Sequence, residues 1–170
     1  MLNDRVFFVI QSFLKYLPFD FCVFLRRLLY SPFFKVAGRN LRILDGVTIK
    51  YPSDIEIGDD VTINQGCIIN GRGGLAIGND VMMGAGTKIA TTDHNTDRTD
   101  VAMRNQGLTL RRLEIEAEVW FGLDAVILGG STIRKGSTLP AGCDVPGNEH
   151  PEYSFSAAVP VSVCHLRAHV

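Results

Sequence analysis

His94 is the residue of this sequence whose type and position most favour acid–base chemistry. It lies near the start of the segment from Ala90 to Glu114, which interrupts an otherwise regular repeat. Long segments of this kind are uncommon in compact domains and are often functional. Imidazoles ordinarily titrate near about pH 6.5, so a neutral ring can take a proton from a hydroxyl or an amine. The alternative interpretation is that His94 is a solvated loop residue.

The other histidines and the cysteines give weaker indications. His165 and His169 are four residues apart, a spacing that can pair two metal ligands on a helix, but the C-terminal tail lacks a third ligand. We therefore expect no metal site. We expect the cysteines to be small core residues of a protein in a reducing compartment: Cys22, Cys67, Cys143 and Cys164.

The segments on either side of the interruption carry one apolar residue in every six. This period fits neither a helix at about 3.6 residues nor a strand at about 2. It fits a coil of triangular cross-section, in which every six residues form a short strand and a turn. The repeat therefore predicts an all-β fold, a single-stranded parallel β-helix shaped as a triangular prism. The inward-facing residues are Ile57, Ile63, Ile69, Ile77, Met83, Ile89, Ile115, Phe121, Ile127, Ile133, Leu139 and Val145.

The position four residues after each of these tests the prediction, because it faces the tapering interior and must be small. Wherever the repeat continues without a shift, a break or its end, the residue found there is small or β-branched: Val61, Cys67, Val81, Thr87, Val119, Ala125, Ser131, Ser137 and Cys143. The phase of the repeat shifts between Ile69 and Ile77, where Gly71-Arg72-Gly73-Gly74 predicts a bulged corner. Ile43 and Ile49 predict an incomplete first coil.

The beginning of the chain differs in composition from the repeat. Eight of the ten phenylalanines lie at or before Phe34, and basic residues outnumber acidic ones there. Apolar residues at helical spacing run through 6–17 and 21–29, which predicts two short helices. Neither stretch reaches the roughly 18 uncharged residues that a membrane span requires. No small-residue cleavage site follows, so we do not expect a signal peptide.

Three interpretations of this first segment remain open. The helices can pack on the end or side of the prism, or residues 1–36 can form a basic, aromatic surface that rests on an anionic membrane. The third interpretation is that the segment docks a partner. The net charge of −1 gives no reason to expect a nucleic-acid partner. We expect a cytoplasmic protein, with peripheral contact at the inner face of the membrane under the second interpretation.

These observations divide the chain into three parts. Residues 1–42 form an N-terminal helical, aromatic and basic segment. Residues 43–147 form the β-helix, with an extruded loop at 90–114. Residues 148–170 form a C-terminal tail.

Two stretches of the repeat resemble a known family. Ile55–His94 and Val119–Thr132 are similar to the left-handed β-helix acyltransferases, also called the hexapeptide-repeat family. Within it, the chain most resembles the sugar and polysaccharide O-acetyltransferases of the maltose/galactoside type. Residues 35–40 resemble members that modify surface polysaccharides. The resemblance implies a left-handed coil, acetyl-CoA as co-substrate, a saccharide acceptor, and a homotrimer with active sites between neighbouring prisms.

The resemblance also implies roles for individual residues. His94 is the general base that deprotonates an acceptor hydroxyl, and the oxygen attacks the thioester carbonyl of acetyl-CoA directly within a ternary complex. Asn70 and Asp93 are candidates for contacts with acceptor hydroxyls. Residues beside the pantetheine arm and along the CoA groove match Ala85, Trp120, Gly122 and Ala141. Each of these has a structural alternative, as a turn residue or as an outward strand residue.

The C-terminal end departs from the pattern of the family. Arg134 stands where a glycine is usual, and the basic residues that often hold the CoA phosphates are missing from their usual places. Arg134 and Lys135 are therefore candidates for this role, together with Arg167.

Three functions compete on these grounds. The first is an acetyl-CoA-dependent O-acetyltransferase that acts on a surface polysaccharide or its precursor. The second is an acetyltransferase for an antibiotic or another small molecule. The third is a β-helix that has lost catalysis and serves as a scaffold.

Overall fold

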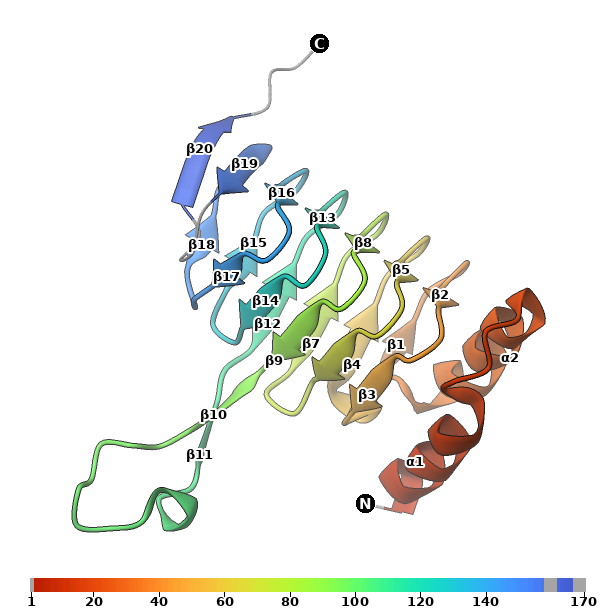
Figure 1. Cartoon of the computed structure of the whole chain (residues 1–170), viewed down its shortest axis with the longest axis horizontal. Helices are drawn as coiled ribbons and strands as arrows, with labels where there is room; N and C mark the ends of the chain where they lie inside the picture. The colour runs from red at the N-terminus through yellow and green to blue at the C-terminus, as the bar shows by residue number, and fades with distance from the viewer. Residues whose placement is uncertain (1, 158–161, 167–170) are drawn as a thin grey trace.

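The protein is a stack of short strands with two helices at one end and a projecting arm on its side (Figure 1). The computed structural model describes residues 2–157 and 162–166. The helices are α1 (Leu2–Leu14) and α2 (Asp20–Tyr30), and short 3-10 turns lie at η1 (Ser31–Phe33), η2 (Pro52–Asp54) and η3 (Met103–Asn105). The two short N-terminal helices predicted from the sequence are thus confirmed.

Three parallel sheets form the faces of the prism, as the repeat predicts. Sheet A contains β1 (Val36–Ala37), β4 (Ile55–Ile57), β7 (Leu75–Ile77), β12 (Leu113–Ile115), β15 (Thr132–Ile133) and β18 (Glu149–His150). Sheet B contains β2 (Arg42–Ile43), β5 (Thr62–Ile63), β8 (Met82–Met83), β13 (Trp120–Phe121), β16 (Thr138–Leu139), β19 (Ser154–Ala157) and the antiparallel β20 (Ser162–Leu166). Sheet C contains β3 (Thr48–Lys50), β6 (Ile68–Asn70), β9 (Lys88–Ala90), β14 (Val126–Leu128) and β17 (Asp144–Val145).

The core is a set of vertical rows in which equivalent residues of successive coils lie in register. In sheet A, for example, Ile57 pairs with Ile77, Ile77 with Ile115, and Ile115 with Ile133. All twelve apolar residues predicted to face inward are buried, and so are all nine small residues four positions later. Burial of apolar surface contributes about 25 cal/mol per Å², so this repeated residue is the main source of stability.

The first coil is complete, which corrects the expectation of a partial one. Val36 and Ala37 form β1 in sheet A, so the coil begins before Ile43. The three N-terminal coils also share a feature that the later coils lack. Each carries extra residues where sheet C leads into the next coil: η2 in the first, residues 71–74 in the second, and the arm in the third. We call this edge of the prism the arm corner.

Helices α1 and α2 cover the open N-terminal end of the prism through two buried polar side chains. The Gln11 amide accepts from the backbone N–H of Ile49 at 2.7 Å and donates to its carbonyl at 3.2 Å, as a neighbouring strand would. Buried Arg26 donates to the carbonyls of Ile43, Leu14 and Leu17. Because edge-strand groups left unpaired in an apolar site are costly, these bonds fix the helices to the first coil. The helices therefore pack on the end of the prism.

In the last coil, the spacing between inward-facing residues is one residue shorter than the six-residue repeat. His150 pairs with Ile133 in sheet A and so takes the inward position of this coil. It lies five residues after inward-facing Val145, one residue fewer than the repeat of six. The ring is buried, and neither of its nitrogens has a hydrogen-bond partner among the described groups. Burial lowers the pKa of His150. A polar ring therefore occupies a position that elsewhere holds an aliphatic residue.

None of the helices in the described residues is long and apolar enough to cross a membrane.

We predict that His150→Ile stabilises the protein, and more so in acid. The substitution continues the row of isoleucines and removes two unpaired buried nitrogens, which we expect to raise the free energy of unfolding by about 1–3 kcal/mol at pH 7. The pKa of His150 is lower in the folded chain, so the wild type loses stability as the pH falls from about 6.5. Urea unfolding at pH 7 and pH 5 measures both effects. His94→Gln, at an exposed histidine, is the control, and an equal pH dependence in wild type and His150→Ile would contradict the prediction.

Candidate functional site

The segment that interrupts the repeat is a β-hairpin arm rather than an irregular loop. Strands β10 (Thr92–His94) and β11 (Leu108–Leu110) pair antiparallel, with His94 opposite Leu108 and Asp93 opposite Thr109. The tip is held by Gln106, which donates to the carbonyls of Arg98 and Val101 and accepts from the Arg98 N–H. The arm is therefore an ordered projection from the arm corner (Figure 1).

Buried Thr91 anchors the arm to the coil below. Its hydroxyl donates to the Asn70 carbonyl at 2.9 Å and accepts from the Gly73 N–H at 2.7 Å. The Thr91 carbonyl accepts from the Arg111 N–H as the chain returns. Gly73 has no substitute here, because a Cβ on it would lie 2.1 Å from the Thr91 carbonyl oxygen. The glycines of the corner thus allow the close approach that fixes the base of the arm.

His94 lies at the end of β10 with its side chain exposed to solvent. No hydrogen bond of its ring to another described group is found, so both nitrogens are accessible to a ligand. The Asp93 carboxylate accepts from the backbone N–H of His94 at 2.8 Å. That carboxylate therefore shapes the backbone at His94.

Asn70 lies directly beneath the arm, on the side that His94 shares. Its amide donates to the Thr92 hydroxyl at 3.2 Å, and its carbonyl oxygen accepts from the Arg72 N–H. Alternate residues of a strand point to opposite faces, so His94 is on the same face of β10 as Thr92. The structure thus brings Asn70 and His94 to one side of the arm. Asp93 lines a hollow on the arm corner together with Thr92, Arg111 and Pro146.

The small residues predicted to lie beside the cofactor stack along another edge of the prism, where sheet B leads into sheet C. Ala85, Gly122 and Ala141 belong to this edge in three successive coils. The coils approach closely, since a Cβ on Gly122 would lie 2.3 Å from the Ala141 nitrogen. Trp120 lies next to this edge on β13, 46% exposed and in register with exposed Met82.

The two basic residues predicted to hold the CoA phosphates are paired with carboxylates. Arg134 contacts Glu116 at 2.8 Å and Glu149 at 2.9 Å, and Lys135 contacts Glu118 at 2.9 Å. The hydrogen bond that Arg134 donates to Glu116 lowers the pKa of Glu116, and the hydrogen bond that Lys135 donates to Glu118 raises the pKa of Lys135. Both cations would have to exchange a carboxylate for a phosphate. Arg167 lies outside the described residues.

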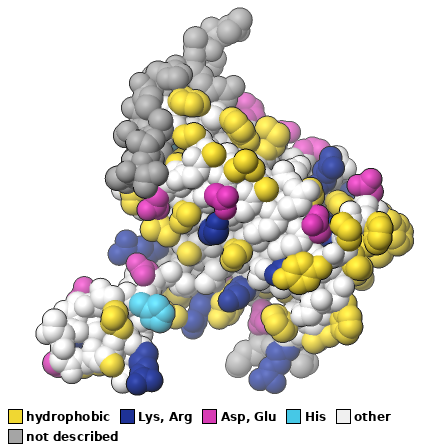
Figure 2. Space-filling model, in the orientation of Figure 1, with side chains coloured by type: hydrophobic (Ala, Val, Ile, Leu, Met, Phe, Trp, Pro, Cys, Tyr) yellow, Lys and Arg dark blue, Asp and Glu magenta, His cyan; other side chains and the backbone are white. Residues whose placement is uncertain are grey.

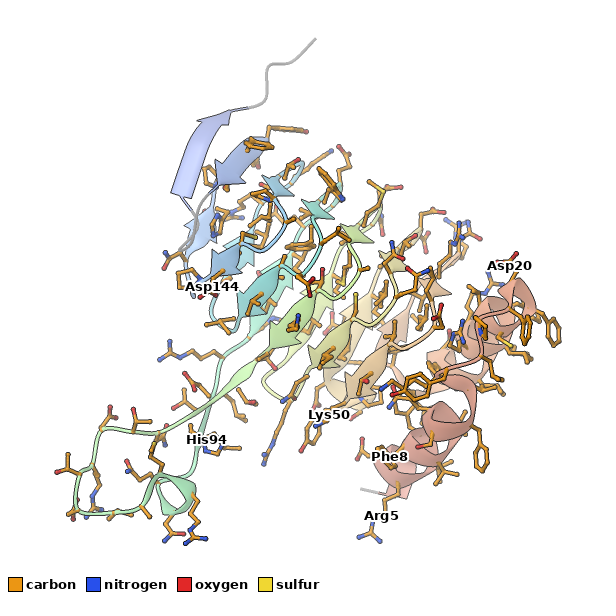
Figure 3. All side chains as sticks on the ribbon, in the orientation of Figure 1. Arg5, Phe8, Asp20, Lys50, His94 and Asp144 are labelled. Carbon is orange, nitrogen blue, oxygen red and sulfur yellow. The ribbon has the colours of Figure 1, made fainter. Side chains whose placement is uncertain are left out.

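One chain does not assemble all of these residues at a single point. Trp120 is on sheet B, and the small residues flank the start of sheet C. His94 lies on the arm, beyond the end of sheet C (Figure 3), and Asn70 is the last residue of β6 at the same edge of that sheet. Each side of sheet C therefore carries one part of the predicted site.

Sequence reasoning missed Thr91 and Arg111, which shape the arm corner. Arg111 lines the hollow beside Asp93. Its place depends on the pairing of β10 with β11, and no repeat extends through the arm to reveal that register. Thr91 directly follows β9, the last strand before the break, and this position was the one indication in the sequence that Thr91 could hold the arm.

Within residues 2–157 and 162–166, no three histidine, cysteine or carboxylate side chains converge to hold a metal ion. His169 lies outside these residues, as does the side chain of His165.

Curated sequences include two related proteins of greater length. A probable acetyltransferase of Mycobacterium tuberculosis is 29% identical over 131 residues, which is 76% of this chain and 43% of the relative. A relative from Schizosaccharomyces pombe is 30% identical over 103 residues, 58% of this chain and 48% of its own length. The chain thus spans less than half the length of either. No protein-family model matches it.

Solved structures share the fold over nearly the whole chain. A hexapeptide-repeat acetyltransferase from Vibrio cholerae O1 biovar eltor, complexed with acetyl-CoA, has a TM-score of 0.87 at 20% identity. The match covers 99% of this chain and 88% of that one. A maltose O-acetyltransferase from Clostridium difficile 630 has a TM-score of 0.86 at 20% identity, with coverage of 98% and 87%. The shared part includes the N-terminal helices as well as the prism.

We predict that Thr91→Val loosens the arm without unfolding the prism. The variant keeps the shape of the side chain but leaves the Gly73 N–H without its partner, which should cost about 1–3 kcal/mol of local stability. Hydrogen exchange should become faster at the amides of residues 92–95 and 108–111. Thr96→Val, at an exposed arm residue, serves as the control. Unchanged exchange at the base of the arm in Thr91→Val would show that these bonds do not hold it.

Proposed function

We propose that this chain, which shares the repeat and the fold of hexapeptide-repeat β-helix acetyltransferases, is an acetyl-CoA-dependent O-acetyltransferase for a saccharide hydroxyl. The observation that carries this proposal is the placement of His94. Its imidazole, to which no described group is hydrogen-bonded, lies near the base of the hairpin arm, on the side that Asn70 shares. The acetyl-CoA complex and the maltose acetyltransferase among the structural matches support the donor and the acceptor class.

In the proposed reaction, His94 acts as the general base. Its ring takes the proton of an acceptor hydroxyl, and the oxygen attacks the thioester carbonyl of acetyl-CoA. The C–S bond then breaks and the proton passes to the leaving thiolate, giving the acetyl ester and CoA. A backbone N–H would stabilise the tetrahedral oxyanion. Base catalysis provides about 10² to 10⁴-fold, so the positioning of both substrates must provide much of the rest.

Asn70 is the residue we assign to the acceptor, because its amide lies below the arm within reach of the face that carries His94. Asp93 is also a candidate, although its carboxylate is engaged by the backbone of His94. Asn70 is only partly occupied by Thr92 and Arg72, at 3.2 Å and 3.3 Å, and can form better bonds with a sugar hydroxyl.

We place acetyl-CoA along the edge formed by Ala85, Gly122 and Ala141, with Trp120 beside it. Small side chains there let a thin pantetheine arm approach the backbone, and the exposed indole offers an apolar surface to it. The phosphates would lie toward Arg134 and Lys135. Because both cations already hold carboxylates, their contribution to CoA affinity should be small.

A homotrimer would complete this site. His94 is open to solvent within one chain, and Trp120 lies on another face of the prism. A second prism packed against the arm would enclose the base and bring a cofactor edge next to it. Exclusion of water strengthens the electrostatic interactions that catalysis uses.

The proposed location is cytoplasmic, with the helices resting on the inner face of the membrane. Figure 2 shows hydrophobic side chains gathered over the end formed by α1 and α2. Phe13 is 75% exposed and Phe24 is 51% exposed, on the sides of their helices away from the core. Arg27 lies over the Phe24 ring, 5.9 Å from its centre, and Arg5 is on the first turns of α1; neither has an ion-pair partner among the described carboxylates. Amphipathic helices of this composition bind anionic lipid surfaces.

We predict that His94→Ala lowers acetyl transfer by about 10² to 10⁴-fold. CoA release from acetyl-CoA in the presence of maltose, galactosides and other saccharides measures the rate. Because His94 is exposed and makes no side-chain bond to a described group, the stability of the fold should not change. Thr96→Ala on the same arm is the control. Full activity in His94→Ala would refute the assignment of the base, and no turnover by the wild type with any acceptor would favour the inactive scaffold.

We predict that Phe13→Ser combined with Phe24→Ser weakens binding to phosphatidylserine vesicles at least about tenfold, since each buried phenylalanine contributes about 1.5–3 kcal/mol. Co-sedimentation measures the bound fraction. Removal of residues 1–36 is not a clean test, because it also removes the bonds of Gln11 and Arg26 to the first coil. Leu123→Ser, at an exposed leucine on a later coil, is the control. If the intact chain does not bind the vesicles, the membrane surface is excluded.

A further inference from the structure

A hollow of about 430 Å³ lies between α1 and the first coil, and neither the reaction nor the core uses it. Its walls are mainly apolar and come from Phe7, Phe8, Val9, Ile49, Tyr51 and Pro52. It opens to the surface. A concave apolar site of this size can hold a stretch of hydrocarbon chain, which an exposed flat patch cannot.

Positive charge predominates at the rim of this hollow. Arg5 comes from α1 and Lys50 from the end of β3, and Asp4 is the one carboxylate that lines the site. Arg72 lies just beyond, with its guanidinium 5.5 Å from the centre of the Tyr51 ring. No described carboxylate forms an ion pair with Arg5, Lys50 or Arg72. An anion attached to the hydrocarbon would therefore find cations at the mouth.

The hollow is aligned with the base of the arm. Lys50 pairs with Asn70 of the next coil, and Asn70 pairs with Ala90, from which the arm departs. Coils are spaced about 4.8 Å apart, so two steps of roughly 10 Å in total separate the cationic rim from the arm. Figure 3 shows Arg5, Phe8, Lys50 and His94 along one edge of the molecule. His94 lies four residues further out from Ala90, up to about 13 Å at about 3.3 Å per residue, so a phosphate followed by a short saccharide can span the whole distance.

We propose that this hollow binds the hydrocarbon tail of a lipid-linked, phosphorylated saccharide whose sugar is acetylated at His94. This inference rests on the proposed function and specifies its acceptor. The tail would lie against Phe8 and Val9, the phosphate would contact Arg5 and Lys50, and the sugar would extend past Asn70 to the arm. A free sugar would leave the apolar walls unused. The acceptor would then be modified while it is attached to its carrier.

Dodecyl phosphate, below its critical micelle concentration, tests the site by calorimetry with the intact protein. It should bind at least about tenfold more tightly than dodecanol or inorganic phosphate, because only dodecyl phosphate contacts both the apolar walls and the cationic rim. Arg5→Ser with Lys50→Ser should lose that advantage. Val9→Trp, at a 54% exposed residue, should block the hollow without disturbing the core. Arg104→Ser, on the arm, is the charge control and should bind like the wild type.

Equal affinity for dodecyl phosphate and inorganic phosphate would overturn the proposal, since it would indicate an anion site alone. Equal affinity for dodecyl phosphate and dodecanol would overturn it as well, by indicating an apolar surface alone. Binding that survives in Val9→Trp would place the ligand elsewhere and have the same consequence.

Acetyl transfer separates failure of this site from failure of the proposed function. Dodecyl maltoside should be acetylated with a higher kcat/KM than maltose, and Val9→Trp should remove that difference while its rate with maltose is unchanged. If dodecyl phosphate binds as expected but no acceptor is acetylated, the proposed function fails and its acceptor with it. If maltose and dodecyl maltoside react equally well in wild type and Val9→Trp, the enzyme stands and the lipid-linked acceptor is refuted.

Discussion

The fold depends on stacking one buried side chain per face of each coil upon its equivalent in the next coil. Ile57, Ile77, Ile115 and Ile133 illustrate the constraint, because each lies in parallel register with its neighbours. A shift of one residue in a strand would turn its apolar side chain to the solvent. Insertions are therefore confined to the corners, and residues can be added there without disturbing the core.

Residues have been inserted at the arm corner, and the candidate catalytic residue lies at the same corner. A 3-10 turn, a glycine-rich bend and the hairpin arm occupy it in three successive coils. Each addition is held to its neighbour by backbone bonds or by a short side chain, of which Thr91 is the main example. The same edge thus carries the apolar hollow, Asn70 and His94 in sequence along the prism.

The two ends of the stack are closed in different ways. At the N-terminal end, Gln11 and Arg26 supply the hydrogen bonds that a further coil would have made. At the other end, His150 takes an inward position with both ring nitrogens unpaired among the described groups. Burial of an unpaired ring lowers its pKa and makes this coil sensitive to acid. The helices can therefore serve as a rigid base for the exposed aromatic surface, while the last coil is the weaker part.

The sequence by itself determined the prism, its inward residues and the position of the break, because a six-residue period admits one arrangement of core side chains. It also indicated His94, since the break is visible without coordinates. Only the tertiary structure decided that the break is a paired hairpin, that Asn70 supports it, and that Arg134 and Lys135 are held by carboxylates. It also placed α1 against the first coil to form the hollow. These features arise from contacts between residues fourteen or more positions apart, which follow no period and leave no local pattern in the chain.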